Sequence, residues 1–325
     1  MILPHGKFLH LAAGAAALAC FVVLASLSSA LSQSARTIKI IVPLAPGGAA
    51  SVLARLLADQ LGTMPGVTAF VENRPGGSSA IGTVAVARAA SDGNTLLVTN
   101  TSILINPHLR KQEYDPLTSF AAVCQLVSLP IVLAVNSASP YRTLADLIAA
   151  ARARPGELTL ASFTATGGHI AFESLKRKAK ADITFVPYAG SAPAVTALLG
   201  AHVTAMMDNY ATMGEHVSAG RLRALATFGR SRTNGLDVPT VIESGIDVEY
   251  EGWFGLFAPA NVPKDILSQT AAWTTTALQK PDVQQKLEPL GLLPPTVCGE
   301  EFTASVRKSY EEFGRVIREA NIKAE

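Results

Sequence analysis

The chain has 325 residues, of which 49% are hydrophobic and 16% charged, and its formal net charge is +2 with the histidines counted as neutral. This composition excludes a disordered chain and favours a well-buried core, with length enough for two domains. The densest basic group, at 176–180, is typical of a solvated helix face, and no basic stripe with interleaved aromatic residues occurs. We therefore expect no nucleic acid among the partners.

The first 30 residues have the pattern of an export signal. Lys7 precedes an apolar run over 11–27, and Ser28-x-Ala30 fits a signal-peptidase site. We expect a signal peptide over 1–30, with cleavage between 30 and 35. An uncleaved membrane anchor and lipidation at Cys20 are the alternatives. No later apolar run reaches membrane-spanning length, so we expect the mature chain to be soluble.

The mature chain would retain two cysteines, Cys124 and Cys298, which lie far apart in the sequence. They match no metal-ligand spacing, so no zinc site is expected. Export permits a disulfide between them, but we interpret both as free thiols with structural roles.

Strand-like and helical patterns alternate along the first part of the mature chain. Strands are predicted over 38–44, 67–71 and 96–99, with helices over 51–61 and 81–90. This β-α-β-α-β order predicts a parallel sheet with right-handed crossovers. The segment that follows, 100–107, is interpreted as a polar turn.

The pattern then restarts at a long apolar run. Strands are predicted over 129–136, 158–163, 183–188, 202–209, 221–228 and 249–259, and helices over 144–154, 170–178, 194–199, 213–219, 264–279, 281–290 and 300–320. Extended segments near Asn136 and Trp253 fit two crossings between domains. We predict an α/β protein with one domain from 36–136 plus 252–325 and a second from 137–251, each a mainly parallel sheet flanked by helices.

Four loops that follow predicted strands share an unusual composition. They span 45–51, 100–102, 164–169 and 189–193, and they contain glycine, hydroxyl and small residues with almost no charge. Open parallel sheets bind ligands at the carboxyl ends of their strands, where the next helices begin. Glycine lets backbone amides approach a ligand, and helix N-termini offer unpaired N–H donors. Together the loops predict a site that holds a small anion without Arg or Lys.

Catalytic motifs are largely missing. The 45–52 stretch lacks the Gly-Lys-Ser/Thr end of a P-loop, and 75–82 fits neither a dinucleotide fingerprint nor a nucleophile elbow. His169 is a candidate general base, but we favour a helix-start residue whose ring bonds nearby backbone. Asp208 could contact a ligand or cap the next helix. Trp253 and Phe254 are interpreted as core residues at a hinge.

The motifs together resemble a known family, the Bug-type extracytoplasmic solute receptors of tripartite tricarboxylate transporters. The resemblance runs from Ile38 to Ile322 and is carried by segments in fixed order: VPLAPGG, VENRPGG, IGT, DGNTLL, PGELTLAS, VPYAGSAPA, LRALAT, DVPTVIESG and LEPLGL. It implies a hinged two-domain periplasmic-binding-protein fold of type II that closes over small organic anions, with no catalysis, cofactor or metal. The implied ligand-binding residues are Pro46, Gly47, Gly48, Ser51, Thr101, Ser102, Thr164, Thr166, Gly167, Tyr188, Gly190, Ser191, Ala192 and Asp208.

One position departs from the family pattern. The family usually carries Asp three residues after the glycine pair, where this chain has Ser51. A ligand ammonium group would lose a partner there, and a second ligand carboxylate would meet less repulsion. We therefore hypothesise a carboxylate ligand without an amine.

The resemblance predicts a periplasmic receptor that hands a small organic carboxylate to the membrane subunits of a transporter. We expect a monomer. An orphan or sensory receptor that feeds a membrane kinase is the alternative, and an exported hydrolase or lyase that uses His169 or Asp208 is a less favoured one.

Overall fold

A computed structural model of the chain describes residues 36–323 apart from 165, 189, 234, 289–291, 293 and 295–296. The predicted signal peptide and its cleavage site lie outside the described residues. Among the helices of these ranges, none combines the length and apolar character that crossing a bilayer requires.

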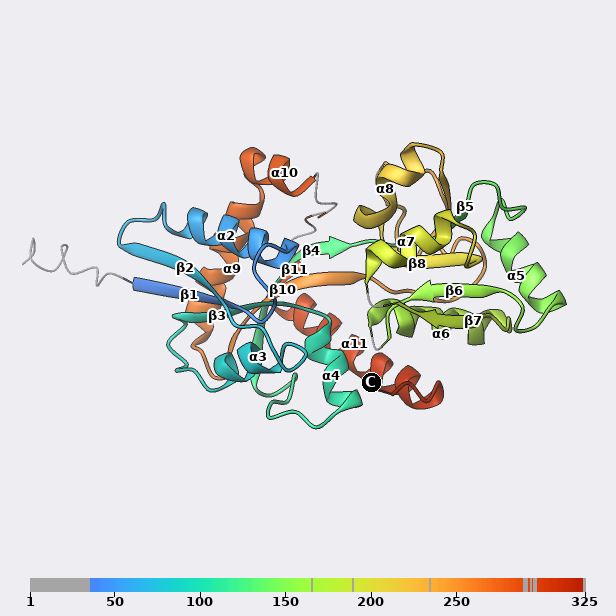
Figure 1. The fold of residues 1–325 in the computed structure, drawn as a ribbon. Coiled ribbons are helices and arrows are strands. Elements are labelled where there is room, and N and C mark those ends of the chain that lie inside the picture. The colour runs from blue at the N-terminus through green and yellow to red at the C-terminus, as the bar shows by residue number, and fades with distance from the viewer. Residues whose placement is uncertain are drawn as a thin grey trace, which may run out of the picture.

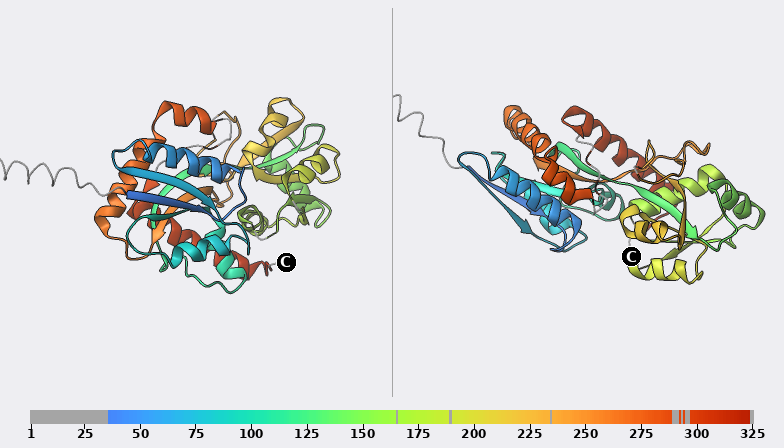
Figure 2. Two further views of the ribbon diagram at one scale, coloured as in Figure 1. Left: turned by 60° about the vertical axis from the view of Figure 1, so that its left-hand side comes forward. Right: turned by 90° about the horizontal axis from the view of Figure 1, so that it is seen from above.

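The described residues form two sheets that lie side by side, each with helices packed on it (Figures 1 and 2). We call the first sheet and its helices the first lobe. Its strands are β1 (Arg36–Val42), β2 (Val67–Asn73), β3 (Thr95–Asn100), β4 (Phe120–Leu129), β10 (Gly252–Pro259) and β11 (Val297–Cys298), and its helices are α2 (Ala49–Leu61), α3 (Ala80–Ala87), α4 (Ser102–Leu109), α9 (Lys264–Leu278), α10 (Pro281–Leu287) and α11 (Glu300–Glu319).

The second sheet and its helices make up the second lobe. Its strands are β5 (Ile131–Asn136), β6 (Thr159–Ser162), β7 (Thr184–Pro187), β8 (Ala205–Asn209) and β9 (Leu222–Thr227), and its helices are α5 (Leu144–Ala153), α6 (Gly167–Ala179), α7 (Ser191–Leu199) and α8 (Tyr210–Ser218). The strand order is β11-β4-β10-β3-β1-β2 in the first sheet and β7-β6-β8-β5-β9 in the second.

Both sheets are mixed, which corrects the expectation of mainly parallel sheets. β1 pairs in parallel with β2 and β3, and β6 pairs in parallel with β7 and β8. The strands next to the crossings run the other way: β10 is antiparallel to β3 and β4, and β5 is antiparallel to β8 and β9. A strand that has just crossed between lobes enters its sheet from the edge where the parallel strands end, so it must run antiparallel to them.

The two crossings between the lobes lie next to each other. β4 leads through Pro130 directly into β5, and the returning strand β10 begins at Gly252, which is paired with Leu129. β5 belongs to the second sheet, although the sequence analysis assigned its residues to the first domain. We propose that the domains divide at Pro130 and between Tyr250 and Gly252.

The sequence analysis missed three elements of the first lobe: β4, α4 and the two-residue strand β11. β4 is a central strand between β10 and β11, so it is buried along most of its length and shows no polar alternation. α4 contains Pro107, which has no N–H to bond the carbonyl of Ile103. The hydroxyl of Tyr114 donates to that carbonyl instead, at 3.3 Å, and so supports the helix.

Cys124 and Cys298 form a disulfide between β4 and β11, which corrects the expectation of free thiols. The two residues are directly opposite partners in the antiparallel pairing of these strands, with their Cα atoms 4.0 Å apart. Their distance along the chain hid this proximity. The disulfide ties the segment before α11 to the strand that leads into the second lobe.

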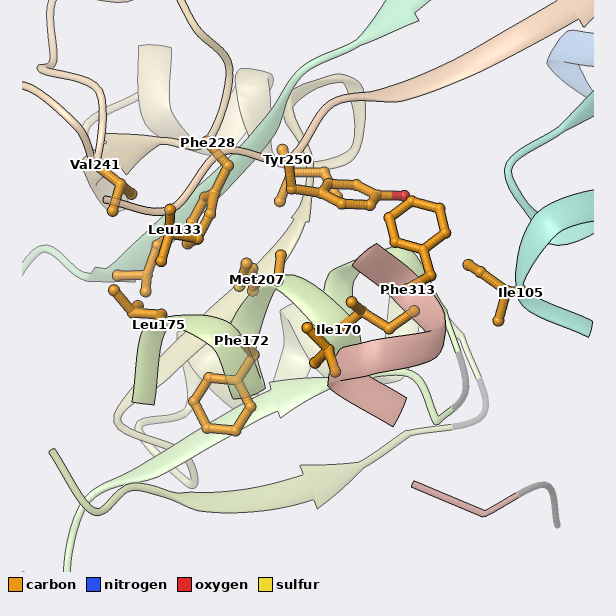
Figure 3. Packing of buried hydrophobic residues seen from close by; sticks show 14 of the residues in the cluster. Ile105, Leu133, Ile170, Phe172, Leu175, Met207, Phe228, Val241, Tyr250 and Phe313 are labelled. Carbon is orange, nitrogen blue, oxygen red and sulfur yellow. The ribbon is translucent and has the colours of Figure 1, made fainter. Parts of the chain in front are cut away.

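Hydrophobic packing is continuous from one lobe to the other. One cluster of buried side chains includes Ile105 of α4 and Phe313 of α11 as well as Ile170 of α6 and Phe228 beside β9. Figure 3 shows these side chains together with Tyr250. The predicted core residues Trp253 and Phe254 are 3% and 7% exposed. The lobes are thus joined by packed side chains as well as by two chain crossings.

Candidate functional site

Strand register places the carboxyl ends of the parallel strands of both sheets near the crossings. Asn100, the last residue of β3, pairs with Phe254, two residues after β10 begins. Asn209, the last residue of β8, pairs with Ile131, the first residue of β5. Because β4 continues into β5 at the crossing, the two carboxyl edges face each other there, as ligand binding between lobes requires.

The four predicted loops lead into the helices α2, α4, α6 and α7, whose N-cap residues are Gly48, Thr101, Thr166 and Gly190. None of these helices carries an acidic residue in its first turn. Their first backbone N–H groups have no intrahelical acceptor, and their dipoles favour an anion. Each predicted loop therefore supplies one helix start at the facing edges.

The loop before α2 is fixed by hydrogen bonds of Ser51, and its glycines are exposed. Pro46, Gly47 and Gly48 are exposed, and Gly47 has φ = +92°, a conformation that favours glycine. Ser51 is only 1% exposed: its hydroxyl accepts a hydrogen bond from Asn73 Nδ2 at 2.7 Å and donates to the carbonyl of Ala45 at 3.4 Å. The Ser51 side chain thus fixes the loop that presents the glycines.

The start of α4 offers two hydroxyl groups. The backbone N–H of Ser102 donates to Asn100 Oδ1 at 3.0 Å, which fixes the first turn. Ser102 Oγ is buried and has no hydrogen-bond partner among the described residues. The hydroxyl of Thr101, which is 8% exposed, bonds the Tyr250 hydroxyl at 3.2 Å.

In the second lobe, Thr166 caps α6. Its hydroxyl accepts from the His169 backbone N–H at 3.4 Å and donates to the carbonyl of Phe163 at 2.8 Å. Gly167 follows and is buried. Thr164 lies in the same loop, half-buried. The Thr166 hydroxyl is therefore engaged with backbone, and the loop around it is fixed.

The start of α7 is organised by a buried carboxylate. Asp208, at the end of β8, is 5% exposed. Its Oδ2 accepts from the hydroxyls of Ser191 at 2.7 Å and Thr212 at 2.9 Å, and its Oδ1 accepts from the backbone N–H of Asn209 at 2.7 Å. Burial raises the pKa of the Asp208 carboxyl, and the hydrogen bonds from Ser191, Asn209 and Thr212 oppose this shift. Asp208 thus holds two helix starts, α7 and α8, at one edge.

The remaining predicted residues of this loop differ in exposure. Tyr188 is half-buried, and its backbone N–H bonds the carbonyl of Ser162 at 3.0 Å. Gly190 is half-buried and Ala192 is exposed. An added Cβ at Gly190 would meet nothing within 4 Å, so its backbone faces open space.

His169 has the features of a packed core residue. Its ring stacks on Phe185 with centroids 4.0 Å apart and planes 7° apart, and the residue is 8% exposed. Burial, with a smaller contribution from the charge of Lys176, lowers the pKa of the imidazole to about 4. A base that weak is poorly matched to proton abstraction near neutral pH.

One residue at this site was missed by the sequence analysis. Tyr250 lies between the two lobes, bonded to Thr101 of the first and packed against Gly167 of the second. The stretch that contains it was interpreted only as an extended run with core aromatic residues. The sequence did contain a signal: a tyrosine lies just before the predicted crossing between the domains, and a buried tyrosine hydroxyl needs a hydrogen-bond partner.

Within the described ranges, no group of three or more His, Cys, Asp or Glu side chains is placed to hold a metal ion. The donors at the facing edges are instead amides and hydroxyls, which suit an anion or another hydrogen-bond acceptor.

Comparison with known proteins agrees with this architecture. The family model of the tripartite tricarboxylate transporter family receptor matches residues 53–322. Protein BugT of Bordetella pertussis is 33% identical over 301 residues, which cover 91% of this chain and 92% of BugT.

Two solved structures extend the comparison to the fold. A TctC solute-binding protein from Polaromonas, solved without ligand, superposes with a TM-score of 0.83 at 26% identity, covering 89% of this chain and all of that one. An R. palustris protein solved with adipate gives a TM-score of 0.72 at 30% identity, covering 89% and 98%. The fold is that of two-domain periplasmic solute-binding proteins, and the chain belongs to the Bug-type receptors of the tripartite tricarboxylate transporter family.

Proposed function

We propose that this receptor works in the periplasm, binds a small organic carboxylate between its lobes and delivers it to the membrane subunits of a tripartite transporter. The observation that carries the proposal is the convergence of helix starts without acidic residues, α2 and α4 from one lobe and α6 and α7 from the other, on facing strand edges. Such helix starts stabilise an anion through backbone N–H groups. The relative solved with adipate supports a carboxylate ligand.

The contacts divide the predicted residues into two groups. The ligand would face amides near Gly47, Gly48 and Gly190. It would also face the buried hydroxyl of Ser102, which bonds none of the described residues. We assign the remaining ligand contacts to Pro46, Thr101, Thr164, Gly167, Tyr188 and Ala192, and to the backbone N–H groups of Thr166 and Ser191, whose hydroxyls already bond protein groups. Ser51 and Asp208 already bond protein partners on several sides, so we assign them to shaping the loops.

Ser51 also bears on the chemistry of the ligand. A carboxylate at this place would add negative charge at the first turn of α2 and would favour a ligand ammonium group. The neutral hydroxyl removes that attraction, so we propose a ligand with carboxylate groups and no amine. A second carboxylate on the ligand is compatible with this site.

Two adjacent chain crossings connect the lobes, so we propose that the lobes rotate toward each other when the ligand binds. Small-angle scattering should then show a smaller radius of gyration when a carboxylate binds.

A thermal-shift screen tests the ligand class directly. Succinate, adipate, citrate and benzoate represent carboxylates, and leucine and glutamate represent amino acids. A bound carboxylate should raise the melting temperature by mass action. Its affinity should fall only gently with salt, because backbone dipoles in a closed site are poorly screened. Stabilisation by the amino acids alone would contradict the proposal.

Delivery needs a separate test. Uptake of the bound acid by cells should be lost when the receptor gene is deleted and restored when it is returned. Binding without any effect on uptake would instead indicate a sensory receptor.

A further inference from the structure

Tyr250 occupies the crossing through which the chain returns to the first lobe. Its backbone N–H bonds the carbonyl of Phe228, beside β9 in the second lobe, at 2.8 Å. Two residues later, Gly252 pairs with Leu129 in the first sheet. The backbone of Tyr250 is therefore fixed where the facing strand edges of the two lobes meet.

The Tyr250 side chain is buried, with 6% of the residue exposed, and its ring packs against Phe313 with centroids 5.7 Å apart. Figure 3 shows this pair, with the hydroxyl directed away from Phe228 in the core of the second lobe. The hydroxyl bonds Thr101 Oγ1 at 3.2 Å, and a Cβ added to Gly167 would lie 1.5 Å from it. The hydroxyl thus lies between the N-terminal ends of α4 and α6.

Among the described residues, the hydroxyls of Tyr250 and Thr101 bond only each other, so one of their two protons remains to be donated. Two hydroxyl groups that share one hydrogen bond use one O–H, and the accepting hydroxyl keeps its own proton to donate elsewhere. That remaining donor lies in a buried position, where an unmet hydrogen bond costs free energy. Burial raises the pKa of Tyr250 to about 12, so the phenol keeps its proton at neutral pH.

We propose that Tyr250 is a specificity-determining residue that contacts the ligand, its hydroxyl donating a hydrogen bond to the bound carboxylate while it accepts one from Thr101. This inference rests on the proposed function. A carboxylate only accepts hydrogen bonds, so it fits a donor that stands beside two helix N-termini. An ammonium group only donates, so at this point it would have to compete with Thr101 for the lone pairs of the Tyr250 oxygen.

Tyr250→Phe is the direct test, because it removes the hydroxyl and keeps the ring on Phe313. Isothermal titration of the mature protein would use succinate, adipate, citrate and benzoate as probes. We expect the Kd of the tightest-binding acid to rise by roughly tenfold or more, since the lost bond is to a charged group. The melting temperature without ligand should fall by a few degrees at most, for loss of the Thr101 bond.

Tyr310→Phe is the matched control. Tyr310 lies on α11, stacks on His108 with centroids 4.2 Å apart, and lies away from the facing edges. Its removal should leave the Kd within twofold of the wild type. If the wild type binds none of the four acids, the proposed function itself fails. If the wild type binds and Tyr250→Phe binds within twofold, only the role of Tyr250 fails.

An ultraviolet difference spectrum gives a second readout that does not depend on the folding of Tyr250→Phe. A tyrosine that begins to donate to a carboxylate changes its near-ultraviolet absorption. Addition of the tightest-binding acid should produce this change in the wild type and in Tyr310→Phe protein, which both retain Tyr250. A flat difference spectrum in both at saturating acid would overturn the inference.

Discussion

Gly167→Ala is predicted to disturb the junction of the two lobes far more than its size suggests. A methyl group at this position would lie 1.5 Å from the Tyr250 hydroxyl oxygen and 2.1 Å from its Cζ atom. Ordinary contact needs about 3.4 Å, so the two groups must separate by roughly 2 Å. Tyr250 is buried against Phe313, which leaves little room for its ring to move.

The separation must therefore come from displacement of α6 or from opening of the lobes. Opening of the lobes would stretch the bond of Tyr250 to Thr101, which is 3.2 Å long, and displacement of α6 would move the start of α6 away from the start of α4. Overpacking of this kind costs about 1–3 kcal/mol, and we expect a melting temperature lower by several degrees. Carboxylate binding should weaken as well, because α4 and α6 no longer face one point.

Gly168→Ala is the control, one residue further along the same helix. Its added Cβ would lie 3.1 Å from Ser162 Oγ, a contact that a shift of a few tenths of an ångström relieves. We expect a cost below about 1 kcal/mol. Thermal melts and titrations of both variants measure the difference. Equal effects of the two substitutions would refute the close packing of Gly167 on Tyr250.

Three further substitutions test other parts of the structure. Ser51→Asp should weaken binding of a dicarboxylate a few-fold relative to Ser51→Asn, since a charge at a helix start contributes about 0.3–1 kcal/mol. Equal affinities of the two variants would show that residue 51 does not influence the choice of ligand. Asp208 has a pKa raised above its usual value of 3.8, so its ionisation costs stability as pH rises through the raised pKa. Asp208→Asn should lack this loss of stability. The expectation would be contradicted if the melting temperature of the variant fell more steeply than that of the wild type between pH 4 and pH 7. Replacement of both Cys124 and Cys298 by serine removes a link between positions 174 residues apart. It should lower the free energy of unfolding, measured with urea, by up to about 5 kcal/mol. Two free thiols in the denatured wild type would disprove the disulfide.

Local sequence patterns predicted most elements because those elements carry their own periodicity and caps. The helix predicted over 144–154, for example, matches the start of α5, where the structure shows a capping box of Thr143 and Asp146. β4 was missed because a strand buried between two others needs no polar alternation. α4 was missed because Pro107 is usually read as the end of a helix, and the support from Tyr114 is a tertiary contact.

The candidate site shows the same division between local and tertiary information. Small uncharged loops before helices are visible in sequence, and each of the four leads into a helix start. Partners are not visible: the link from Ser51 to Asn73 spans 22 positions, and the link from Thr101 to Tyr250 spans 149. The role of Tyr250 therefore could not be predicted from its neighbours. The disulfide was misjudged for the same reason.

A site built from helix starts suits a receptor that must exist both empty and loaded. A buried cation without its anion would cost several kcal/mol in the empty state. Backbone N–H groups near the exposed Gly47 and Gly48 can bond water when no ligand is present. In the proposed binding mode, closure would replace that water with carboxylate oxygens and exclude solvent, which would strengthen each dipole contact. Binding energy would then depend on closure, so a partner that reopens the lobes would release the ligand.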